Sequence, residues 1–131
     1  MISIPDRTKQ FALRIIKAYG YLKKQNEECR LIGKQLFRSA TSVGAMVREG
    51  ISAQSLNDKI NKMEIALKEA RESQYWIELL IESELVPKER FQPLLNEAIR
   101  EANSPAKLSE CRRHSIGKIL TASTKTLKSK K

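Results

Sequence analysis

The sequence predicts an all-α protein, an antiparallel four-helix bundle in up-down-up-down order, from its size, its composition and the spacing of its apolar residues. At 131 residues the chain has the size of one domain. Apolar residues make up 40% of it, and its five glycines and four prolines are too few for the turns of a sandwich or barrel. Apolar residues recur every three or four positions, the spacing of one helix face. We therefore expect a single domain over residues 1–131.

The first predicted helix covers residues 6–24. Its apolar face consists of Phe11, Ile15, Ile16, Tyr19 and Leu22. A polar break at residues 25–28 separates it from a second helix over residues 30–52. The apolar face of this second helix consists of Leu36, Ala40, Val43, Val47 and Ile51. Its middle is rich in small side chains, which let another helix approach closely, so we expect a tight packing seam at Ser39, Ser42 and Gly44.

The third predicted helix, residues 55–84, carries two apolar stripes. Ser55 followed by Asp58 indicates its start, since a serine oxygen there accepts a hydrogen bond from a free amide of the first turn. The first stripe consists of Leu56, Ile60, Met63, Leu67, Ala70, Ile77 and Ile81. The second consists of Ala66, Ser73, Trp76 and Leu80. The second stripe is either part of a wide core face or a subunit interface.

The fourth predicted helix follows Pro87, which disfavours helical geometry in the residue before it, and covers residues 88–102. An interruption or kink is expected around residues 99–115, because Pro105 is incompatible with one straight helix across them. The helix is expected to continue over residues 107–127. Residues 128–131 are expected to form a basic tail.

The net charge of +10 is concentrated at the two ends of the chain. Residues 1–48 carry ten basic against three acidic side chains, residues 49–101 seven against eleven, and residues 107–131 eight against one. Pairing between basic and acidic helices accounts for part of this pattern, and the surplus fits a polyanion such as RNA. The candidate phosphate contacts are Arg14, Lys17, Lys24, Arg38, Arg112, Arg113, Lys128, Lys130 and Lys131.

The chain lacks the residue patterns of catalytic and cofactor sites. Its one histidine, His114, stands beside two arginines, and no GxxxxGK[ST], GxGxxG or HExxH pattern occurs. Cys29 and Cys111 form no CxxC pattern, so we expect neither a disulfide framework nor a zinc site. No apolar run approaches the roughly 20 residues that span a bilayer. We expect a cytoplasmic protein that is not an enzyme, with no cofactor, metal, membrane contact or small-molecule substrate.

Two stretches carry a family resemblance. Residues 35–45 (QLFRSATSVGA), followed by Arg48-Glu49-Gly50 and Ala53-Gln54-Ser55, resemble the second-helix signature of the bacterial four-helix bundle proteins of 23S rRNA intervening sequences. Residues 65–72 and 75–80 resemble the third-helix signature of the same S23-type family. The match runs in order through residues 8–98 and resumes at 116–127.

The sequence also departs from the family pattern. Met46 stands where the family commonly has asparagine, and Lys59 where it commonly has an aromatic residue, so contacts at these two positions are not carried over. Residues 99–115 form an insertion in the last helix.

The resemblance implies an antiparallel bundle that assembles into a homo-oligomeric ring, typically a pentamer, and a function that is poorly defined. A related group is the accessory protein of diversity-generating retroelements, in which a basic oligomer binds a reverse transcriptase and its RNA. No catalytic residue is transferred. Two functions remain open. One is non-catalytic binding of structured RNA, with a ribosomal or reverse-transcriptase ribonucleoprotein as partner, and the other is a protein-interaction scaffold without a nucleic-acid role.

Overall fold

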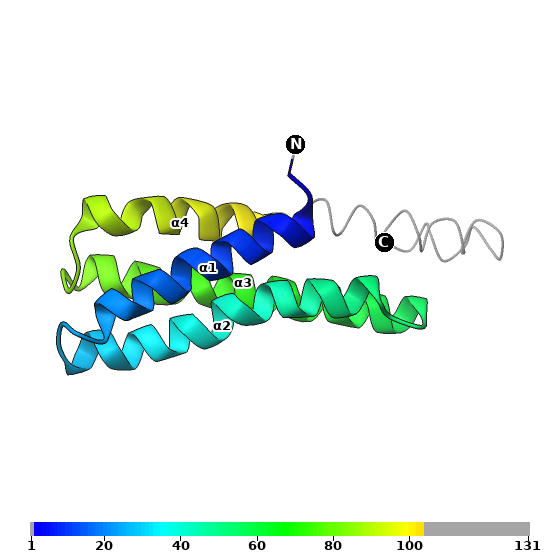
Figure 1. The fold of residues 1–131 in the computed structure, drawn as a ribbon, viewed down its shortest axis with the longest axis horizontal. Helices are drawn as coiled ribbons and strands as arrows, with labels where there is room; N and C mark the ends of the chain where they lie inside the picture. Colours follow the sequence, from blue (N-terminus) through cyan, green and yellow to red (C-terminus); the bar gives the residue numbers. More distant parts are fainter. Residues whose placement is uncertain (1, 104–131) are drawn as a thin grey trace, which may run out of the picture.

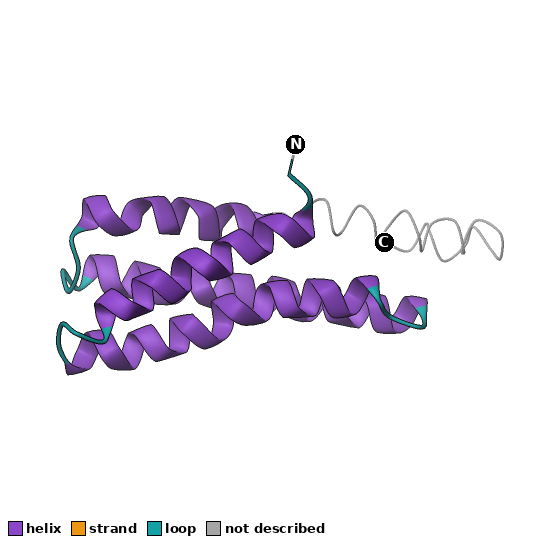
Figure 2. Cartoon of the chain, in the orientation of Figure 1, coloured by secondary structure: helices purple, strands orange, loops and turns teal. Residues whose placement is uncertain are grey.

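The computed structural model describes residues 2–103, and these form four helices packed as a bundle. The helices are α1 (Ile4–Leu22), α2 (Glu27–Ile51), α3 (Leu56–Glu82) and α4 (Lys88–Asn103) (Figure 1). Short loops join them, and residues 2–103 contain no strand (Figure 2). The predicted four-helix bundle is confirmed. The interruption predicted around residues 99–115 does not begin within residues 99–103, because α4 is continuous to Asn103. The rest of that range, the predicted helix over 107–127 and the basic tail lie outside the described residues.

Each helix packs against two neighbours in the bundle. The pairs in contact are α1 with α2, α2 with α3, α3 with α4, and α4 with α1. The α2–α3 contact is the most extensive and the α1–α4 contact the slightest. In Figure 1 the α1–α2 and α3–α4 loops lie at one end, and α2 and α3 extend beyond the other two helices at the opposite end. The α1–α4 side is therefore the most open side of the bundle. Within residues 2–103, every helix falls short of the length and apolar character that spanning a bilayer requires.

The N-terminal caps explain where the first three helices begin. Ser3 Oγ accepts a hydrogen bond from the Asp6 amide at 3.3 Å, so α1 begins two residues before the apolar pattern predicts. Asn26 Oδ1 accepts one from the Cys29 amide at 2.8 Å, so the polar break predicted at 25–28 contains the cap of α2. Ser55 Oγ accepts one from the Asp58 amide at 3.1 Å, which confirms the predicted cap of α3.

The main core is built from one face of each helix. Its largest fully buried side chains are Phe11, Phe91, Ile15, Leu22, Leu36, Ile77 and Leu80. Two predicted core residues are exposed instead. Ile16 is 45% exposed because it is turned about 100° away from the buried Ile15, and Ile51 is 57% exposed because it ends α2 beyond the cover of α1 and α4.

The buried face of α3 combines members of both predicted stripes. Ala66, Ser73 and Leu80 of the second stripe are buried in the core of the chain itself, together with Ala70 and Ile77 of the first. Trp76 is half-buried and packs against the same core. Burial therefore favours the wide core face over a subunit interface for the second stripe.

The C-terminus of α3 ends in a left-handed residue that is not glycine. Glu84 has φ 61°, its amide donates to Ile81 O at 3.0 Å, and the Leu85 amide donates to Leu80 O at 3.2 Å. This pair of hydrogen bonds is the Schellman motif, in which glycine is the preferred residue at the left-handed position. The helix thus ends at Glu82 through its own cap, several residues before Pro87.

Replacing Glu84 by glycine is expected to stabilise the protein. A side chain in the left-handed region costs roughly 1–2 kcal/mol, and the added freedom of glycine in the unfolded chain offsets part of that gain. We expect Glu84→Gly to raise the free energy of unfolding by about 0.5–1 kcal/mol, measured by urea titration. Glu84→Ala, which removes the charge and keeps the Cβ, is the matched control. Equal stability of the two variants would contradict the prediction.

Candidate nucleic-acid interface

The open side of the bundle holds a groove between α1 and α4. Its first part has a volume of about 450 Å³ and is lined by Ile2, Arg7, Gln10, Phe11, Arg14, Glu97 and Arg100. Its second part has a volume of about 460 Å³ and is lined by Arg14, Lys17, Ala18, Arg90, Phe91 and Leu94. Arg14 lines both parts, and we refer to them together as the α1–α4 groove. Five of the lining residues are basic and one is acidic, so the groove attracts anions.

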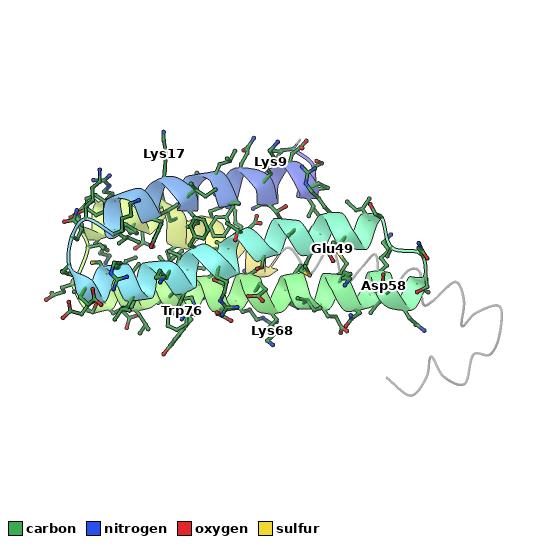
Figure 3. The ribbon with its side chains drawn as sticks, turned by 60° about the horizontal axis from the view of Figure 1, so that its bottom comes forward. Lys9, Lys17, Glu49, Asp58, Lys68 and Trp76 are labelled. Carbon is green, nitrogen blue, oxygen red and sulfur yellow. The ribbon has the colours of Figure 1, made fainter. Side chains whose placement is uncertain are left out.

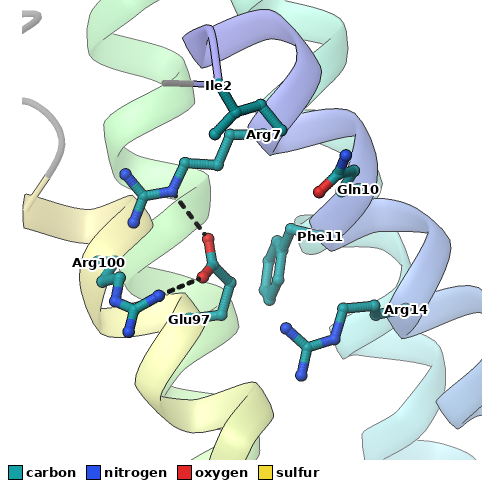
Figure 4. A pocket seen from close by; sticks show the side chains of 7 residues that line it. All are labelled: Ile2, Arg7, Gln10, Phe11, Arg14, Glu97 and Arg100. Carbon is teal, nitrogen blue, oxygen red and sulfur yellow. Dashed lines mark hydrogen bonds and ion pairs between the residues drawn. The ribbon is translucent and has the colours of Figure 1, made fainter.

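In the first part of the groove, one carboxylate pairs with two of the three lining arginines. Glu97 accepts a hydrogen bond from Arg7 Nε at 3.0 Å and another from Arg100 Nη1 at 3.3 Å (Figure 4). Arg7 comes from α1 and the other two residues from α4, so this cluster also ties the two helices together. The side chains of Glu97 and Arg7 are 11% and 27% exposed, so their ion pair is partly shielded from solvent, whereas Arg100 is 68% exposed.

A second carboxyl lies behind this cluster. Glu101, one helical turn after Glu97, has a side chain that is 1% exposed, and its Oε2 is 3.3 Å from the same Arg7 Nε. Burial and the neighbouring Glu97 carboxylate raise the pKa of Glu101 to about 8. Burial alone would raise the pKa of Glu97 too, but its contacts with Glu101 and Arg7 outweigh burial and lower it. A raised pKa beside a lowered one favours a single proton shared by the two carboxyls over two full negative charges.

The second part of the groove carries three cations and no lining carboxylate. Arg14 and Lys17 are exposed on α1, and neither makes an ion pair within residues 2–103. Arg90 on the opposite wall lies over the ring of Tyr21, with its guanidinium carbon 3.9 Å from the ring centroid. This cation–π contact restrains Arg90 while leaving its donors available. The second part is therefore a positively charged cleft.

The structure separates the candidate phosphate contacts that the sequence predicts. Arg14 and Lys17 lie together in the groove, whereas Lys24 is exposed in the α1–α2 loop. Arg38 lies on α2 and pairs with Glu72 of α3 at 3.3 Å, so it is engaged in a contact between helices rather than in the groove. In Figure 3, Lys9 and Lys17 project from α1, on the opposite side of the bundle from Lys68 and Trp76. The remaining candidates lie outside the described residues, namely Arg112, Arg113, Lys128, Lys130 and Lys131.

Sequence reasoning missed the α4 wall of the groove and one residue of the α1 wall. Arg7 is one heptad before Arg14, a spacing that places both on one face of α1 and could have been recognised. Arg90 and Arg100 gave no such signal, because the contact between α1 and α4 joins residues that are far apart in the sequence.

The comparisons with known proteins agree with this architecture. The family model of the 23S rRNA-intervening sequence protein matches residues 2–104. The chain belongs to this family. A crystal structure from the S23 ribosomal protein family of Bacteroides thetaiotaomicron, a protein of unknown function, is similar with a TM-score of 0.76 and 39% identity, covering 81% of this chain and 97% of that one. No curated protein matches the chain. The family resemblance carried by residues 35–45 and 65–80 is thus confirmed.

In this member of the 23S rRNA-intervening sequence protein family, the three residues of the predicted seam on α2 have different surroundings, and of the three Ser39 contacts α3. Ser39 Oγ and Ser73 Oγ are 2.9 Å apart, and both residues are fully buried. Within their own helices, Ser73 Oγ also bonds Glu69 O at 2.9 Å and Ser39 Oγ bonds Leu36 O at 3.3 Å, so either hydroxyl can be the donor between them. Ser42 bonds only its own helix, at Arg38 O, and Gly44 faces Thr8 of α1. The seam at Ser39 is therefore a close contact between two helices.

Residues 2–103 contain few other groups that could form a catalytic or metal-binding site. No group of three or more metal-ligating side chains occurs within residues 2–103. Cys29 is fully buried beside Leu85 O, and burial raises the pKa of its thiol, which makes it a poor nucleophile. The charged groove is accordingly the candidate site of this part of the chain.

Proposed function

We propose that this protein binds structured RNA without catalysing a reaction, through basic surfaces that a homo-oligomer multiplies. The observation that carries the proposal is the second part of the α1–α4 groove, where Arg14, Lys17 and Arg90 face no lining carboxylate. Free cations in a cleft attract phosphates, and the release of counterions from the nucleic acid favours binding. The net charge of +10 supports the same class of partner.

Oligomerisation is part of the proposal. The family resemblance implies a pentameric ring, and several copies of one weak basic surface bind a polyanion more tightly than a single copy. The family description names 23S rRNA, which supports structured RNA as the partner, alone or in a ribosomal or reverse-transcriptase ribonucleoprotein. We place the protein in the cytoplasm and assign it no cofactor. Light scattering of the full chain tests the ring, and a monomer would contradict it.

The first test is the salt dependence of RNA binding. We expect the full chain to bind a fluorescently labelled RNA hairpin, measured by anisotropy. Its affinity for the hairpin should fall roughly tenfold or more when the salt concentration rises from about 50 to about 200 mM, because binding releases counterions condensed on the RNA. Arg112→Glu with Arg113→Glu should weaken binding further if the basic end of the chain takes part. An affinity that does not change with salt would contradict this mode of binding.

A protein-interaction scaffold is the second candidate, and exposed apolar side chains on α1 favour it. Leu13 and Ile16 are 54% and 45% exposed and lie three residues apart on one helix. An apolar pair of this kind fits a protein partner better than RNA. Leu13→Ser with Ile16→Ser separates the two candidates. RNA affinity should be unchanged in this variant, and a partner held by α1 should be lost.

A further inference from the structure

We propose that the phosphodiester backbone of the RNA lies along the second part of the α1–α4 groove and contacts Arg14, Lys17 and Arg90. This inference rests on the proposed function and names the site at which it occurs. The two walls of the groove come from different helices, with Arg14 and Lys17 on α1 and Arg90 on α4. A strand lying in the groove would therefore meet cations on both sides.

The two parts of the groove differ in the charge that they leave available. In the first part, Glu97 pairs with Arg7 and Arg100, and a phosphate there would have to displace a shielded carboxylate. In the second part no carboxylate lines the surface, and neither Arg14 nor Lys17 forms an ion pair within the described chain. An anion that enters the second part can therefore bind Arg14 and Lys17 without breaking an existing ion pair. We therefore place the phosphates in the second part.

The floor of the groove determines which part of the RNA it can recognise. Phe11 and Phe91, the aromatic residues of the lining, are each only 1% exposed, so no ring face is free for a base to stack on. The exposed groups are guanidinium and ammonium donors, which bind phosphate oxygens. Contacts of this kind position a nucleic acid and carry no base sequence. The groove is thus a sequence-independent phosphate site.

Charge reversal on the two walls tests the site. Arg14→Glu with Lys17→Glu changes the α1 wall, and Arg90→Glu changes the α4 wall. The matched control is Lys34→Glu with Lys68→Glu, which gives the full chain the same net charge as the α1-wall variant and alters exposed residues that do not line the groove. Circular dichroism and light scattering confirm that each variant has the fold and assembly of the wild type. Arg14→Gln with Lys17→Gln provides a milder version of the first change.

Binding to the RNA hairpin gives distinct results for each possibility. We expect the α1-wall variant to lose roughly tenfold or more in affinity, with a salt slope reduced by about 2, and the control to lose much less. Arg90→Glu should also weaken binding, which a contact along α1 alone would not produce. Equal losses of affinity in the groove and control variants, or no loss in Arg90→Glu, would contradict the groove as the binding site but not the proposed RNA binding itself. A wild type that binds no RNA would overturn the proposed function itself.

Discussion

Ser39→Leu is expected to destabilise the protein by about 3 kcal/mol, because the α2–α3 seam has no room for a larger side chain. The Ser39 and Ser73 hydroxyls are 2.9 Å apart and fully buried, and this distance keeps the two helices close together. A leucine must push α3 away along the most extensive contact of the bundle. It also leaves the remaining serine with one hydrogen-bond partner fewer. Urea unfolding followed by circular dichroism measures the loss.

Substitutions at neighbouring serines separate overpacking from the loss of the hydroxyl. Ser42→Leu, at a half-buried position whose hydroxyl bonds only its own helix, should cost less than about 1 kcal/mol. Ser39→Ala and Ser73→Ala should each cost about 1 kcal/mol, and the double variant less than their sum, since the two residues share one hydrogen bond. A Ser39→Leu protein as stable as Ser42→Leu would show that the seam is not tightly packed.

The seam also shows which parts of the fold can be predicted from the sequence. Small residues in the middle of a predicted helix indicate a close approach, and the periodic apolar residues place all four helices. The pattern cannot show how far the neighbouring helices extend, so it predicts Ile51 in the core, whereas Ile51 is exposed in the structure. Nor could composition reveal that Asn26, within a polar stretch, caps α2, because capping depends on backbone geometry at one residue.

The groove could be predicted on one wall only. Arg14 and Lys17 lie on one helix, and their spacing within the helix indicates that they are neighbours. Which helix faces them is decided by the packing of the whole bundle, and the sequence gives no local signal that Arg90 is that neighbour. Arg38 is the opposite case, in which the structure adds a partner that the sequence does not indicate. Its charge made it a candidate for RNA, but Glu72 stands within 3.3 Å on the adjacent helix, so part of its charge is already paired.

The buried carboxyl pair was also missing from the sequence reasoning, and it leads to a prediction about pH. Glu101 has an ordinary pKa of 4.5, which the fold raises to about 8, so the folded state binds a proton more tightly than the unfolded state. The Glu101 carboxyl therefore makes its full contribution to the free energy of unfolding below pH 4.5, and this contribution falls as the pH rises towards 8. Glu97 has a lowered pKa, so its contribution is lost only when the pH falls below its ordinary value of 4.5. Between pH 5 and 8 the slope therefore belongs to Glu101.

We expect the free energy of unfolding to fall by on the order of 2 kcal/mol between pH 5 and pH 8, since a single group gives at most about 1.4 kcal/mol per pH unit and Arg7 offsets part of the cost of the buried charge. Glu101→Gln cannot ionise, so its stability should change much less over this range and exceed that of the wild type at pH 8. The measured quantity is the difference between the urea titrations of the two proteins at each pH, because groups common to both cancel in that difference. Glu89→Gln, at an exposed position of the same helix, serves as the control. If the wild type and Glu101→Gln have parallel pH profiles, Glu101 is already ionised in the folded protein at pH 5 and Arg7 neutralises both carboxylates.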